Sequence, residues 1–75
     1  MDIREFIDKF AGEFDETPME TFTPETDYKA LDEWNSLTAL SVVAMVGEVY
    51  HKTITGNDVR NHTPIAELAE FVENK

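Results

Sequence analysis

The sequence predicts an all-α domain of four helices, with a long first connection and a short third helix. Apolar residues recur at spacings of three and four near both ends of the chain, as in amphipathic helices. Between them lies an apolar run of about 15 residues, which is too long for a typical strand. A chain of 75 residues has room for one core, so we expect residues 1–75 to form a single domain.

Residues 2–14 are predicted to form the first helix, because an apolar stripe runs along them: Ile3, Phe6, Ile7, Phe10, Ala11 and Phe14. Residues 15–35 contain Pro18 and Pro24 and have no sustained apolar period, so we expect a long loop. Residues 27–31 are predicted to form a short helical turn. Four side chains are expected to fix the loop to the helices: Phe22, Tyr28, Leu31 and Trp34.

The second helix is predicted from Ser36 to about His51 and is apolar nearly all round. Such a helix is either central or leaves an apolar face for a partner. Its residues are expected to join those of the other helices in the core: Val43, Val46, Tyr50, Phe6, Phe10, Leu68 and Phe71.

Two shorter helices complete the domain. Thr55 is predicted to cap a short helix over residues 56–60. Thr63 is predicted to cap the last helix, with Pro64 at its first position. The apolar stripe of this helix comprises Ile65, Leu68, Ala69, Phe71 and Val72.

Charge and composition exclude several function classes. Sixteen acidic and six basic residues give a formal charge of −10, which disfavours nucleic acid and anionic membranes and favours basic protein surfaces. The chain has no cysteine for a disulfide or a nucleophile. It also has no apolar run of about 18 residues and no secretory leader. We therefore expect a cytoplasmic monomer that binds neither membrane nor nucleic acid.

Ser36 is the candidate functional residue. It follows Asn35 at the start of the most apolar helix, where backbone amides and the helix dipole favour a phosphate group. The competing interpretation is that Ser36 or Asn35 is only an N-cap.

Several segments together resemble the acyl carrier, or phosphopantetheine carrier, family: Trp34-Asn35-Ser36-Leu37, Glu48-Val49-Tyr50, Ile54, and Thr63-Pro64-Ile65-Ala66-Glu67-Leu68. The resemblance implies an acyl-carrier-like four-helix bundle and a 4'-phosphopantetheine arm on Ser36. A phosphopantetheinyl transferase (holo-carrier synthase) would donate the arm from coenzyme A. Acyl-transferring or acyl-activating enzymes with basic docking patches, from fatty acid or specialised lipid and secondary-metabolite biosynthesis, would then use the carrier, which performs no catalysis itself.

The resemblance also implies a docking surface around Ser36. Its apolar part is predicted to be Leu37, Leu40 and Ala44, although core packing is an equal alternative for Leu40. Its polar part is predicted to be Asp32, Glu33, Asn35 and Glu48.

Two positions depart from the pattern of the family. Asn35 replaces the usual Asp, and Glu48 is the only acid of the second helix, where fatty-acid-synthesis carriers have several. Trp34 is similar to a variant found in discrete carriers of specialised pathways.

Other sites have little support in the sequence. His51 and His62 lie on different elements, no window matches a calcium loop, and Ser36 has no identifiable base, so we predict neither a metal site nor catalytic residues. We expect both histidines to be solvated. Two alternatives to an acyl carrier stay open: an aminoacyl or peptidyl carrier, and an unmodified acidic helical module that binds a basic partner.

Overall fold

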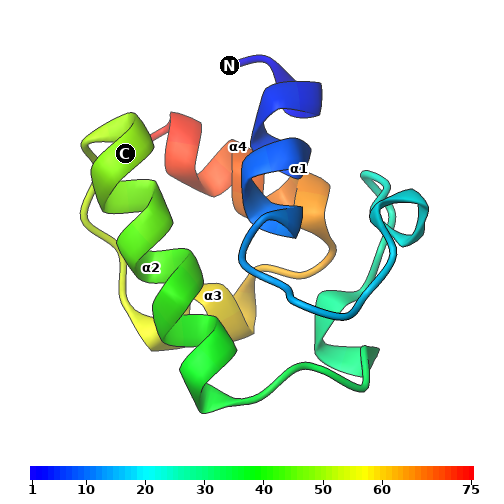
Figure 1. Cartoon of the computed structure of the whole chain (residues 1–75). Coiled ribbons are helices and arrows are strands. Elements are labelled where there is room, and N and C mark those ends of the chain that lie inside the picture. The colour runs from blue at the N-terminus through cyan, green and yellow to red at the C-terminus, as the bar shows by residue number, and fades with distance from the viewer.

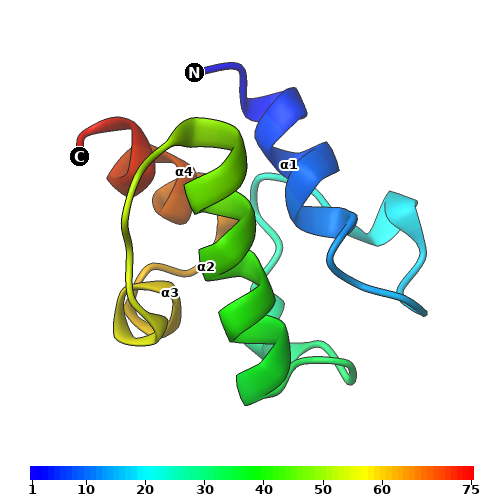
Figure 2. The same ribbon diagram turned by 60° about the vertical axis from the view of Figure 1, so that its left-hand side comes forward.

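The computed structural model describes all 75 residues and contains four α-helices and no strand, which confirms the predicted fold class. The elements are α1 (Ile3–Ala11), α2 (Ser36–Tyr50), α3 (Gly56–Asn61) and α4 (Ile65–Glu73), with the 3-10 turns η1 (Met19–Thr21) and η2 (Tyr28–Ala30) in the first connection. The helix α2 packs on α1 and α3, and α4 packs on α1 (Figure 1). Figure 2 shows the short α3 beside the N-terminal half of α2. None of these helices combines the length and apolarity needed to cross a membrane.

The interior is built entirely from hydrophobic side chains, and no polar or charged residue is buried. Phe10 lies at its centre, with ring centroids of Phe14 and Tyr28 at 5.4 and 5.0 Å. Of the predicted core residues, Phe6, Phe10, Val46 and Leu68 are buried. Val43, Tyr50 and Phe71 are only partly buried and pack against the core from its edge.

The first helix is shorter than predicted. It begins after Asp2, whose carboxylate accepts a hydrogen bond from the Arg4 amide, and it ends at Ala11. Gly12, a poor helix former, follows as the C-cap. Phe14 is nevertheless buried, because the turn after α1 aims its ring at Phe22, 5.0 Å away between centroids. The apolar spacing therefore identified the buried residues but placed the helix end too late.

The ends of α2 and α3 are defined by specific caps. His51 terminates α2 in the left-handed region, at φ 56° and ψ 37°. Thr55 caps α3 as predicted, in a capping box in which Thr55 and Asp58 each accept a hydrogen bond from the other's backbone amide.

The predicted start of the last helix is wrong by one position. Pro64 precedes the helix instead of occupying its first position, and α4 begins at Ile65. Thr63 does not cap it, because its hydroxyl donates instead to the Asp27 carboxylate at 2.8 Å.

The long loop supplies the missing cap of α4. The amide of Ile65 donates to the Thr26 carbonyl at 3.1 Å, and that of Ala66 donates to the Pro24 carbonyl at 2.9 Å. Amides at a helix start have no partner within the helix, so these contacts satisfy the first turn and fix the loop at once.

Tyr28 anchors the loop to α3 and to the residue that ends it. Its hydroxyl donates to the backbone carbonyls of Val59 and His62. Phe22 is buried like Tyr28, and Leu31 and Trp34 pack partly buried on the core. The prediction that these four side chains fix the loop is confirmed, as is the helical turn near residue 28. The turn η1 was not predicted.

Candidate functional site

Ser36 occupies the first position of α2 and is exposed to solvent. The N-cap of this helix is Asn35, whose side-chain oxygen accepts a hydrogen bond of 3.0 Å from the Thr38 amide. The Ser36 hydroxyl makes no hydrogen bond within the protein. The capping interpretation is therefore correct for Asn35 and wrong for Ser36, whose hydroxyl is free to react.

The local electrostatics favour a negative group at this position. The start of α2 carries the positive end of the helix dipole, and its first turn contains no acidic residue. This is uncommon in a chain of such acidity, since the first turns of α1, α3 and α4 each contain a carboxylate. Ser36 thus lies at the one α-helix start whose first turn contains no acid.

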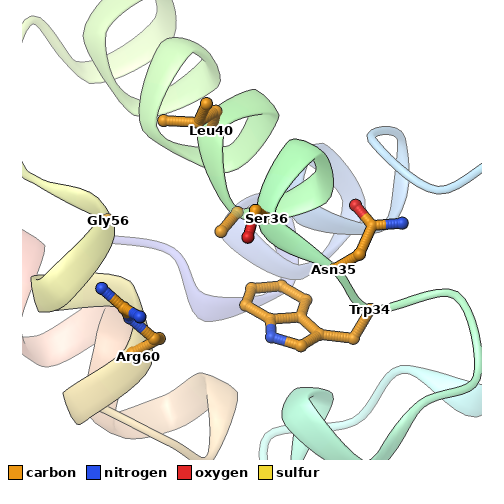
Figure 3. A pocket seen from close by; sticks show the side chains of 7 residues that line it. Trp34, Asn35, Ser36, Leu40, Gly56 and Arg60 are labelled. Carbon is orange, nitrogen blue, oxygen red and sulfur yellow. The ribbon is translucent and has the colours of Figure 1, made fainter.

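A pocket of about 380 Å³ opens beside Ser36, between the N-terminal half of α2 and the helix α3. Its lining comprises Trp34, Asn35, Ser36, Ala39, Leu40, Gly56 and Arg60. Figure 3 shows the Ser36 hydroxyl next to the Trp34 indole and the Asn35 amide turned to the other side, with Arg60 across the pocket on α3. No acidic residue lines the pocket.

Sequence reasoning missed Gly56 and Arg60 as members of this site. Both lie on α3, four positions apart and hence on one face of the helix. That spacing is visible in the sequence, but nothing local indicates that this face lies opposite Ser36. Only the packing of α3 on α2 brings the two segments together.

The predicted apolar docking residues form an exposed stripe on α2. Leu37 and Leu40 are 75% and 58% exposed, and Ala44 is exposed beside them. The alternative that Leu40 is a core residue is therefore wrong, because Ala39 and Val42 occupy the buried face instead. Glu48 is exposed on the same stripe, and Asp32 is exposed in the loop that precedes α2.

Glu33, which was predicted to contribute charge to docking, already has partners inside the protein. Its carboxylate accepts hydrogen bonds from the backbone amides of Asp15, Glu16 and Thr17, and from the Thr17 hydroxyl at 2.7 Å. The Thr17 hydroxyl, followed by the three amides, lowers the pKa of Glu33 below its ordinary value of 4.5. Glu33 therefore closes the loop onto itself just before Ser36, and its docking role stays a prediction.

The two histidines differ in their surroundings. His51 is exposed, as predicted, whereas His62 is half-buried, contrary to prediction. The His62 ring stacks on Phe71 with centroids 4.0 Å apart, and its Nδ1 hydrogen-bonds to the Asp58 carbonyl. No group of three or more His, Asp or Glu side chains is arranged to hold a metal ion.

No family model, curated protein or solved structure matches this chain. The assignment of a function therefore rests on the residues around Ser36 and on their arrangement.

Proposed function

We propose that this protein is an acyl carrier, which holds acyl groups as thioesters on a 4'-phosphopantetheine arm attached to Ser36. The observation that carries the proposal is the state of the Ser36 hydroxyl. It is exposed and uncommitted at the start of α2, because Asn35 has taken the capping role. The acyl-carrier-like arrangement of the four helices and the cytoplasmic location belong to this proposal.

The residues around Ser36 fit such a group. A phosphodiester there would meet the positive end of α2 and a pocket whose only charged residue is the cation Arg60. The α3 wall of the pocket has room, because a Cβ atom added at Gly56 would contact no neighbouring segment within 4 Å. The arm would supply a thiol, which this cysteine-free chain lacks.

Attachment requires only that Ser36 act as the acceptor. Its Oγ forms a bond to the phosphorus that carries the pantetheine half of coenzyme A. The pyrophosphate bond breaks and the nucleotide half departs, while the hydroxyl proton passes to a base of the phosphopantetheinyl transferase. Because the enzyme provides the base, the absence of one beside Ser36 is consistent with this reaction.

The exposed stripe of Leu37, Leu40 and Ala44 would receive acyl-transferring or acyl-activating enzymes next to the attachment site. Glu48 and Asp32 would supply charge at its edge for a basic patch on the partner. The small number of acids on α2 supports a dedicated partner of a specialised pathway rather than the general enzymes of fatty acid synthesis.

The test is the intact mass of the protein after coexpression with a broad-specificity phosphopantetheinyl transferase. A carrier gains the mass of one phosphopantetheine, and the Ser36→Ala variant gains none. An unchanged wild-type mass would reject the carrier function.

Two other functions share part of this site. An aminoacyl or peptidyl carrier would gain the same mass, and the activating enzyme that loads its thiol would distinguish it. An unmodified interaction module is favoured by the exposure of Leu37 and Leu40 alone. Such a module would show no mass change.

A further inference from the structure

The pocket beside Ser36 combines two kinds of surface. The Trp34 indole, Ala39 and Leu40 are apolar, whereas Arg60 brings a positive charge from α3. A ligand that fills it would need an anionic group next to a small apolar group. If the proposed function holds, the part of the arm nearest Ser36 has this composition, because a phosphodiester is followed by a carbon that bears two methyl groups.

Arg60 is free to bind an anion. It lies within 4.0 Å of no carboxylate, although the chain contains sixteen acidic residues. The one hydrogen bond of its side chain is to the neutral side-chain oxygen of Asn57. A guanidinium carries five N–H donors, so the remaining donors are available to phosphate oxygens.

We propose that Arg60 and Trp34 position the arm: the Arg60 guanidinium pairs with the phosphodiester on Ser36, and the indole and Leu40 pack against the two methyl groups. In the absence of a partner enzyme, the arm would then lie docked against α3 instead of extending into solvent. This inference rests on the proposed attachment at Ser36 and adds a role for residues that attachment itself does not require.

The direct measurement is a nuclear Overhauser effect between the arm methyl protons and the Trp34 ring in the phosphopantetheinylated protein. Trp34 is the only tryptophan in the chain, so the assignment is unambiguous. We expect this contact, together with chemical-shift changes at Arg60 relative to the unmodified protein. Arm methyl signals at the positions of free pantetheine, without the contact, would overturn the proposal.

Substitution of Arg60 separates its charge from its packing. We expect Arg60→Gln to reduce the ratio of docked to undocked arm by about two- to fivefold, the range for a solvent-exposed ion pair. Arg60→Lys should keep part of the docking, because it keeps the charge without the planar fork. Added salt should weaken docking in the wild type but not in Arg60→Gln. Arg4→Gln, which removes an exposed arginine on α1, is the matched control and should have no effect.

A second pair of variants tests the pocket by filling it. Gly56→Leu adds a side chain where the glycine leaves open space, so it should abolish the contact with Trp34. Gly47→Leu adds the same side chain to the exposed side of α2, outside the pocket lining, and should leave the contact intact. Retention of the contact in Gly56→Leu would show that the arm lies elsewhere.

The intact mass of each sample is recorded before the spectra. A protein that gains no mass rejects the proposed function itself, and the arm proposal with it. A protein that gains the mass but shows no contact with Trp34 rejects only the positioning role of Arg60 and Trp34.

Discussion

The Tyr28 hydroxyl donates a hydrogen bond of 3.0 Å to the His62 carbonyl, and the same hydroxyl also bonds the Val59 carbonyl. Burial is the main reason that the pKa of Tyr28 is raised, with the charges of Asp27 and Glu67 adding to it. We expect Tyr28→Phe to lower the free energy of unfolding by about 1–3 kcal/mol, because it leaves carbonyls without their donor. Chemical denaturation measures the change.

Tyr50 provides the matched control. Its hydroxyl is buried without a hydrogen-bond partner, and burial, followed by the charges of Glu5 and Asp2, raises its pKa. Tyr50→Phe should leave stability unchanged or raise it, because it removes a hydroxyl that is desolvated on folding and makes no hydrogen bond in return. Equal losses in both variants would contradict the assigned role of the Tyr28 hydroxyl.

Glu33 makes the closure of the loop sensitive to acid. Its folded-state pKa is lowered, so its contribution to stability is complete above pH 4.5, the ordinary pKa, and is lost as the pH falls through the folded-state pKa. We expect Glu33→Gln to destabilise the protein at neutral pH, and the difference from wild type to shrink toward low pH. Thermal unfolding from pH 7 to pH 2 would show this. Glu20→Gln, at an exposed position in the same loop, should show no such convergence.

Asn35 caps α2 and Ser36 does not, so substitutions at these two neighbouring positions should have different effects on stability. Asn35→Ala removes the cap of α2 and should cost about 0.5–2 kcal/mol of stability. Ser36→Ala removes no hydrogen bond and introduces a better helix former, so stability should hold or rise slightly while modification is lost. Paired melting and mass measurements would decide. A large loss of stability in Ser36→Ala would show that the Ser36 hydroxyl caps the helix after all.

The left-handed backbone at His51 costs free energy that glycine would avoid. His51→Gly should raise the free energy of unfolding by up to about 1 kcal/mol, after the larger entropy of the unfolded glycine is subtracted. His51→Ala tests the cause, because alanine removes the exposed imidazole but keeps the strain. Stabilisation by alanine equal to that by glycine would show that the side chain, not the backbone, was unfavourable.

Salt should stabilise the protein. The charge is −10, yet the only ion pair joins the N-terminal amine to Glu73, so repulsion among carboxylates dominates. Screening at about 0.1 M ionic strength acts beyond roughly 10 Å and relieves this repulsion. We expect Tm to rise by several degrees between low and moderate salt. A falling Tm would contradict the argument.

The sequence predicted the helices because their pattern is local. Apolar residues three or four apart mark the buried faces of α1 and α4, and Thr55 stands directly before the helix that it caps. The same locality explains the errors at helix ends. Threonine is a common N-cap residue, but the Thr63 hydroxyl donates its hydrogen bond to Asp27, far earlier in the chain. Propensity cannot indicate such a competitor.

The same distinction between local patterns and distant contacts applies to the residues of the candidate site. Ser36 was identifiable from its neighbours in sequence, and the exposure of Leu37 was expected from the docking surface that the family resemblance implies. Arg60 was not identifiable, because its relation to Ser36 exists only through the packing of α3 on α2. Glu33 was likewise predicted to be a surface charge. The amides that donate hydrogen bonds to its carboxylate lie in a distant part of the loop, so the sequence near Glu33 does not indicate them.

The carbonyls of Thr26 and Pro24, which receive the first amides of α4, make the long loop and the last helix one cooperative unit. Neither can separate without leaving the other with unpaired backbone groups. The amide protons of Ile65 and Ala66 should therefore exchange with deuterium at the rate at which the loop opens, instead of the rate at which a helix end frays. Although they belong to α4, these two protons report on the freedom of the segment that leads into Ser36.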